Sequence, residues 1–138
     1  MAAQQWMLDT NILSYLIKHP AGALAQRIAR LEPDALCTSA IVACELRFGA
    51  QRKGSPSLSR KVEQLLSEIT VLTLGGDVAI DYADIRFTLE RAGTPIGNHD
   101  LFIAAHARSL GLVLVTHNLR EFARVPGLQV EDWMGAAA

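Results

Sequence analysis

A short apolar run near the N-terminus stops at a carboxylate, and this feature constrains the fold more than any other. Residues 4–8 have the pattern of a strand, Asp9 follows at once, and residues 11–17 have the apolar spacing of a helix. We interpret the run as the first strand of a parallel sheet. In sheets of this kind, ligands bind beyond the carboxyl ends of the strands, so Asp9 is expected to stand at a functional site.

Strands and helices continue to alternate along the chain. Further strands are predicted over residues 35–38, 70–74, 112–116 and 128–130, and further helices from about residue 23 and over residues 40–52, 58–69, 78–89, 101–110 and 119–123. The alternation predicts an α/β fold with a mostly parallel central sheet. With 138 residues, the chain is expected to form one domain over residues 1–138, with a frayed tail at about residues 134–138.

The composition is that of an ordinary globular protein. A formal net charge of −1 argues only against a strongly basic nucleic-acid module. We find neither a signal-peptide pattern nor an apolar run of roughly 18 residues, so we expect a cytoplasmic protein with no membrane contact. Cys37 and Cys44 are expected to be buried free thiols, as is usual in a reducing cytoplasm.

Basic residues are unevenly distributed despite the balanced net charge. Five of them are close together in the sequence: Arg47, Arg52, Lys53, Arg60 and Lys61. A cluster of this kind either faces the phosphate groups of a nucleic acid or is simply a solvated surface. The sequence leaves both interpretations open.

Three acidic residues are candidates for a metal site, although two of them have simpler explanations. Asp9 and Asp100 each stand at the start of a predicted helix, where a carboxylate commonly caps the helix. Glu45 is different, because its helical neighbours are mostly apolar and its side chain would point where a core residue points. A buried, unpaired carboxylate is costly and requires a cation or strong hydrogen-bond donors.

Together, Asp9, Glu45 and Asp100 offer the oxygen ligands that a hard divalent cation requires. Mg²⁺ takes oxygen ligands and keeps several waters, and Mn²⁺ is a possible substitute. Such a site would support hydrolysis of a phosphodiester by a metal-activated water. The sequence has no cluster of His and Cys with zinc spacing.

The histidines and the remaining acids are given ordinary roles. His99 and His117 are expected to be structural or solvated, and His106 to be a hydrogen-bonded core residue. Contact of His117 with a substrate stays open, because it stands beside Asn118 on a loop. Three further acids are expected on the solvent side or in the first turn of a helix: Asp77, Asp81 and Asp84.

Several motifs, in this combination and order, resemble those of PIN-domain ribonucleases, and most closely the VapC toxins of type II toxin–antitoxin pairs. The resemblance covers nearly the whole chain. The motifs are Leu8–Asn11, Glu45–Gly49, Ile96–Ala105, Val115–Phe122, and the C-terminal segments Arg124–Leu128 and Glu131–Trp133.

The resemblance implies a three-layer α/β/α fold and an Mg²⁺-dependent endoribonuclease. It also implies a VapB-type antitoxin as partner, a homodimer, and an RNA substrate, for which it suggests a tRNA anticodon loop. Carried over by position, it assigns the catalytic site to four residues: Asp9, Glu45, Asp100 and Asn118. The first three are the implied metal ligands, with Asp9 and Asp100 binding most directly.

The chain departs from the family at Asn118, where many PIN domains have Asp, and this weakens the case for a second tightly held metal. An amide oxygen can still coordinate an ion or orient a water. Thr10, Asn11 and Thr116 are placed near phosphate or water. Glu121 could act through water, but a surface ion pair with Arg124 is the preferred interpretation.

Three other functions were weighed against this one. A phosphoacceptor signalling domain also gathers acids at strand ends, but it requires a Lys after a later strand, and no Lys follows position 61. A PIN-like domain that only binds nucleic acid is disfavoured by the three intact acids. A PIN-like domain that cleaves DNA is to be separated from a ribonuclease by experiment.

Overall fold

A computed structural model of the protein, which describes residues 4–134, contains a five-stranded sheet. The strands are β1 (Trp6–Leu8), β2 (Leu36–Ser39), β3 (Thr70–Leu72), β4 (Val113–Val115) and β5 (Val130–Glu131). Their order across the sheet is β3-β2-β1-β4-β5, and every neighbouring pair is parallel. The predicted α/β fold with a parallel sheet is therefore confirmed.

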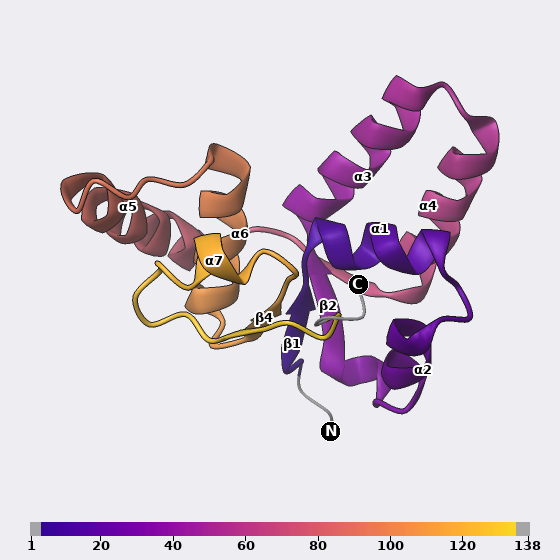
Figure 1. Ribbon diagram of the computed structural model, residues 1–138. Helices are drawn as coiled ribbons and strands as arrows, with labels where there is room; N and C mark the ends of the chain where they lie inside the picture. The colour runs from indigo at the N-terminus through magenta and orange to yellow at the C-terminus, as the bar shows by residue number, and fades with distance from the viewer. Residues whose placement is uncertain (1–3, 135–138) are drawn as a thin grey trace.

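Helices cover both faces of the sheet and complete the predicted three-layer arrangement. They are α1 (Thr10–Lys18), α2 (Ala23–Ala29), α3 (Ala40–Lys53), α4 (Pro56–Glu68), α5 (Gly76–Arg91), α6 (Asn98–Ser109) and α7 (Leu119–Phe122), with a 3₁₀ turn at Pro33–Ala35. Figure 1 shows α1 to α4 on one side of the sheet and α5 to α7 on the other. In the same view, α3 and α4 form a hairpin that extends away from the sheet, with α1 across its base.

The strand order reverses beside β1, and this reversal positions the site. From β1 the chain moves outward through β2 and β3, and it then crosses to β4 on the other side of β1. The register pairs Leu8 of β1 with Val115 of β4, so the next residues of both strands emerge at the same edge. Ligand sites of doubly wound sheets form at such a reversal.

The ends of β1 and β2 are fixed by buried polar contacts. The hydroxyl of Thr38 donates a 2.6 Å hydrogen bond to the carbonyl of Leu8. Ser39 then caps α3 by accepting a hydrogen bond from the backbone N–H of Ile41 at 3.1 Å. These contacts hold the start of α3 against the end of β1, which is where the acids of the two elements must meet.

Element boundaries differ from prediction mainly at the edges of the sheet. The third strand ends at Leu72 instead of residue 74, and the last strand lies at Val130–Glu131 instead of 128–130. Both are edge strands with a single partner, so sequence pattern constrains their ends least. The helix predicted from residue 101 begins at Asn98, which places Asp100 inside its first turn.

The prediction that Cys44 is buried is wrong, whereas Cys37 in β2 is buried as expected; both thiols are free. Helix α3 packs through one stripe of residues: Val42, Ala43, Leu46 and Ala50. Cys44 lies off this stripe and faces outward. The periodicity of α3 is ambiguous in the sequence because apolar residues occur on both of its faces.

Two expectations concern the termini and the membrane. Within residues 4–134, no helix is long and apolar enough to cross a bilayer. The frayed tail expected at about residues 134–138 falls, apart from Met134, outside the described residues.

Candidate active site

The four predicted site residues line one hollow of about 420 Å³ at the carboxyl edge of the sheet. Asp9 follows β1, Glu45 lies on α3, Asp100 on α6, and Asn118 follows β4. The other lining residues come from α1: Thr10, Asn11, Ser14, Tyr15 and Lys18. Segments that are far apart in the sequence thus contribute acidic and amide side chains to one open pocket.

Asp9 is nearly buried, with 4% of its surface exposed, and both of its carboxylate oxygens have a donor. Oδ1 accepts from the backbone N–H of Thr10 at 2.7 Å, so the residue does cap α1. Oδ2 accepts from the hydroxyl of Thr116 at 2.8 Å. Burial raises the pKa of Asp9, and the two hydrogen bonds oppose this rise. The capping role and the site role therefore coexist in one side chain.

Asp100 does not cap α6, because Gly97 is the N-cap residue and Asp100 is the third residue of the helix. The pKa of Asp100 is raised to about 8. Burial is the main cause, followed by a hydrogen bond with the Glu121 carboxyl and by the charges of Glu121, Asp9 and Glu45. Burial and the surrounding acids therefore both favour the protonated form of Asp100 in the absence of a cation.

Glu45 is not the buried, unpaired carboxylate that the sequence predicts. Its side chain is 28% exposed, and Oε1 accepts a 2.7 Å hydrogen bond from the hydroxyl of Thr10. Oε2 lies 3.4 Å from Nδ1 of His99, whose side chain is 71% exposed. The apolar neighbour Phe48 is also exposed, because α3 extends from the body of the protein. Glu45 lines the hollow while remaining accessible to water.

Glu121 is a neighbour of the site that the sequence-based assignment left out. Its Oε2 accepts a 2.5 Å hydrogen bond from the Asn118 amide, and its Oε1 accepts from the backbone N–H of Gly97 at 3.3 Å. The preferred ion pair with Arg124 is wrong, since that guanidinium donates to the carbonyl of Pro95. The three-residue spacing of Asn118 and Glu121 on α7 was the available signal.

Loops at the rim of the hollow are held together by the residues beside the acids. The backbone N–H of His117 donates to Oδ1 of Asn11 at 3.2 Å, and Nδ1 of His117 lies 3.1 Å from Asp132. The backbone N–H of Asn118 donates to the Thr116 hydroxyl at 3.0 Å. These contacts connect the loop after β4 to α1 and fix the direction in which Asn118 enters the pocket.

The donor set of this pocket suits a hard divalent cation. Asp9, Glu45 and Asp100 offer only oxygen donors, and a positive ion would offset both the burial and the neighbouring negative charges that raise the pKa of Asp100. Residues 4–134 contain no group of three His, Cys, Asp or Glu side chains already close enough to hold an ion. The carboxylates therefore line the pocket rather than forming a closed cage, and coordination requires them to turn inward.

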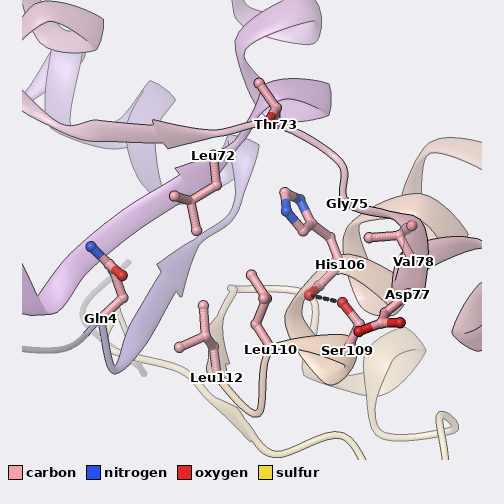
Figure 2. Close-up of a pocket in the computed structure, with 11 residues that line it drawn as sticks. Gln4, Leu72, Thr73, Gly75, Asp77, Val78, His106, Ser109, Leu110 and Leu112 are labelled. Carbon is pink, nitrogen blue, oxygen red and sulfur yellow. Dashed lines mark hydrogen bonds between the residues drawn. The ribbon is translucent and has the colours of Figure 1, made fainter.

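A second hollow, of about 530 Å³, contains none of the predicted site residues. Figure 2 shows His106 pointing into it between Leu72 and Gly75. His106 is buried as predicted, and its Nδ1 lies 2.8 Å from the Ser39 hydroxyl. Burial lowers the pKa of His106, and the Thr73 main chain opposes that shift, although Nε2 meets no partner at hydrogen-bond geometry within the described chain. Within the described residues, one ring nitrogen of His106 thus has a hydrogen-bond partner and the other does not.

Two acids of α5, Asp81 and Asp84, have a partner that the sequence does not predict. Asp77 lies in the first turn as predicted, but Asp81 and Asp84 both bind Arg108 of α6, at 2.5 and 2.8 Å. The same guanidinium donates to the carbonyl of Pro126 at 2.9 Å. These acids have a structural role, joining α5, α6 and the segment before β5.

Comparison with known proteins agrees with this fold and site. The family model for the PIN domain matches residues 6–128. The tRNA(fMet)-specific endonuclease VapC of Salmonella typhimurium is 42% identical over 130 residues, which cover 94% of this chain and 98% of that protein. Ribonuclease VapC1 of Haemophilus influenzae is also 42% identical, over 93% of this chain and 97% of that protein.

Solved structures show the same arrangement. VapBC2 from Rickettsia felis, bound to a promoter DNA fragment, superposes with a TM-score of 0.87 at 32% identity, covering 94% of this chain and 99% of that chain. DNA-bound VapBC from Salmonella typhimurium superposes with a TM-score of 0.86 at 41% identity, covering 94% of this chain and 98% of that chain. The chain therefore belongs to the PIN-domain family and, within it, to the VapC ribonucleases of toxin–antitoxin systems.

Proposed function

We propose that this protein is a toxin that cleaves RNA in an Mg²⁺-dependent reaction at the hollow between β1, α3, α6 and the loop after β4. The observation that carries the proposal is the convergence of Asp9, Glu45 and Asp100 on one accessible pocket at the reversal of strand order. Membership of the VapC ribonucleases supplies the reaction class.

Asp9 and Asp100 would hold the ion most directly, with Glu45 as a further oxygen ligand. When bound, the ion supplies Lewis acidity that activates water and neutralises charge on the phosphate. Mg²⁺ is favoured because it uses few carboxylates and keeps several waters, which suits an open pocket, and Mn²⁺ is expected to substitute. The burial of Asp100 beside other acids, which together raise its pKa, supports this assignment.

Neighbouring side chains set the orientation of the acids. Thr116 and the Thr10 backbone hold Asp9, and the Thr10 hydroxyl holds Glu45. Asn118 is held by Glu121, which leaves the amide oxygen of Asn118 available to orient a water or a phosphate. These residues act by positioning.

The proposed substrate is a single-stranded or looped RNA, with a tRNA anticodon loop as the specific candidate. The site is an open hollow, and unpaired nucleotides can enter such a site more readily than a duplex. A relative that is 42% identical over nearly its whole length carries the name tRNA(fMet)-specific endonuclease. DNA cleavage is the competing activity to be tested.

The proposed partner is a VapB-type antitoxin, since several of the superposed structures are described as VapBC complexes. A homodimer is proposed from family membership, and exposed Ile80 and Phe87 on α5 supply apolar surface for such contacts. The free thiols of Cys37 and Cys44 agree with a cytoplasmic site of action.

The test is incubation of the purified protein with total tRNA and with single-stranded DNA, in Mg²⁺ and in EDTA. RNA cleavage in Mg²⁺ alone is expected, with sequencing of the new RNA ends to locate the cut. Asp9→Asn should lose at least about 100-fold in rate, because it removes charge and a ligand. Full cleavage in EDTA, or cleavage of DNA in preference to RNA, would overturn the proposal.

A further inference from the structure

A basic path leads from the acidic hollow to the α3–α4 hairpin. Lys18, at the end of α1, lines the acidic hollow and also two neighbouring hollows. One of these, of about 200 Å³, lies among α1, α3 and α4 and is also lined by Arg52 and Lys53. The other, of about 560 Å³, is also lined by Arg60 and Lys61 of α4. Figure 1 shows α1 crossing the base of the α3–α4 hairpin. Lys18, at the end of α1, is common to the lining of all three hollows.

Among residues 4–134, the cations along this path have no carboxylate partner. In the described part of the chain, none of Lys18, Arg52, Lys53, Arg60 and Lys61 forms an ion pair. The guanidinium of Arg52 lies over the exposed ring of Phe48, at 5.7 Å. Arg47, by contrast, is bound by Glu63 through two 2.9 Å hydrogen bonds. The sequence cluster therefore divides into one neutralised arginine and four free cations, to which Lys18 is added.

Helix ends alone do not explain this arrangement. Lys18, Arg52 and Lys53 stand in the last turns of α1 and α3, where positive charge is favoured. Arg60 and Lys61 lie within α4, away from its end, and gain nothing from the helix dipole. The path also runs past few acids: Glu45 at its start and Glu68, which accepts a hydrogen bond from Gln64, near its far end.

A phosphodiester substrate requires such a path. The acids of the pocket repel phosphate, so binding of an RNA strand must be driven by cations beside the cleavage position. The protein as a whole carries a net charge of −1, so attraction of the strand beyond the metal site requires a local concentration of unpaired cations. Exposed Lys and Arg side chains at intervals along a groove suit a phosphate backbone and are indifferent to base sequence.

We infer that the backbone of the RNA substrate leaves the acidic hollow along Lys18, Arg52 and Lys53 and continues over Arg60 and Lys61 of the α3–α4 hairpin. This inference rests on the proposed ribonuclease function, and it assigns the hairpin a role as the binding arm for the flanking strand. The five side chains are binding residues for substrate phosphates and have no part in the chemical step.

The test compares two triple variants that remove equal charge. K18Q/R52Q/K53Q removes three cations from the path, and R30Q/R86Q/R91Q removes three from α5 and the end of α2, outside the path. Binding of a fluorescein-labelled oligouridylate is measured by anisotropy over a range of salt concentrations. All the proteins carry Asp9→Asn, which prevents cleavage during the measurement. Thermal unfolding checks that each protein is folded.

The path variant should bind the oligouridylate on the order of tenfold more weakly. The steepness with which the logarithm of the association constant falls with the logarithm of the salt concentration should decrease by roughly 2, because each phosphate contact on a single strand contributes about 0.7. The control variant and the charge-retaining K18R/R52K/K53R should keep the parental slope. An unchanged slope in the path variant, or an equal loss in the control variant, would overturn the inference.

A cleavage assay distinguishes failure of the proposed ribonuclease function from failure of the basic path. The protein with Asp9 intact is assayed for Mg²⁺-dependent cleavage of total tRNA. Cleavage combined with an unchanged salt slope would reject the basic path alone. Absence of cleavage combined with a reduced slope would reject the ribonuclease and leave an RNA-binding path.

Discussion

The hydroxyl of Thr116, at the end of β4, donates a 2.8 Å hydrogen bond to the carboxylate of Asp9, at the end of β1. Thr116 in turn accepts from the backbone N–H of Asn118 at 3.0 Å. One buried threonine therefore joins two central strands and two predicted site residues. The contact depends on the parallel pairing of β1 and β4, which places both strand ends at the same edge.

Thr116→Val should impair catalysis more than folding. The isosteric valine removes the donor to Asp9, leaves that carboxylate less well oriented and raises its pKa further. Loss of such a supporting hydrogen bond costs about 10- to 100-fold in metal affinity or activity. The measurement is the rate of RNA cleavage as a function of Mg²⁺ concentration. Thr116→Ser, which keeps the hydroxyl, should restore most of the rate, and equal defects in both variants would contradict this role.

In the absence of metal, stability should fall as the pH rises from 3.8 to about 8. The pKa of Asp100 is 3.8 in the unfolded reference and about 8 in the folded protein, so the folded state holds the extra proton over this interval. The protonated carboxyl stabilises the fold fully below the pKa that Asp100 has in the unfolded chain. This stabilisation is lost as the pH rises through the pKa that Asp100 has in the folded protein. Asp100→Asn cannot ionise, and its pH profile should be flatter.

The measurement for this prediction is the free energy of unfolding by urea at several pH values in EDTA. The difference between the native protein and Asp100→Asn isolates the contribution of Asp100 from those of Asp9 and the histidines. Asp34→Asn, on the exposed turn before β2, is the matched control and should follow the native profile. A profile for Asp100→Asn that parallels the native one would contradict the raised pKa.

Arg108→Met should destabilise the fold by about 1–3 kcal/mol, because it leaves partly buried acceptors without their charged donor. Arg108 binds Asp81, Asp84 and the Pro126 carbonyl, and its side chain is only 17% exposed. Arg86→Met removes an exposed pair with Glu90 on the same face of the sheet and should cost about 0–1 kcal/mol. Chemical denaturation of both variants measures the contrast, and equal losses would reject a structural role for Arg108.

Much of the fold could be predicted from the sequence because the period of the apolar pattern changes clearly between strands and helices. Asp9 could be predicted from the residues alone because an apolar strand stops abruptly at it, whereas Asn118 entered the predicted site through the family resemblance. The order of the strands is not encoded in any local pattern. The proximity of the two residues therefore became evident only from the pairing of β1 with β4.

Two side chains show where local patterns stop being informative. Glu121 reaches the site because the segment at Gly97 lies beside α7, which is a tertiary contact between residues 24 positions apart. The Glu45 side chain is 28% exposed because the α3–α4 hairpin extends from the sheet; its helical neighbour Val42 is buried in the core, whereas Phe48 is exposed to solvent. In both cases the environment is set by packing of distant elements.

Binding of Mn²⁺ to the purified protein, followed by the electron paramagnetic resonance of the free ion, tests the central claim most directly. The claim is that Asp9, Glu45 and Asp100 converge to hold a divalent cation. Asp9→Asn and Asp100→Asn should each weaken binding at least about tenfold, while Asp34→Asn should bind as the native protein does. Equal Mn²⁺ affinity in all four proteins would contradict the account.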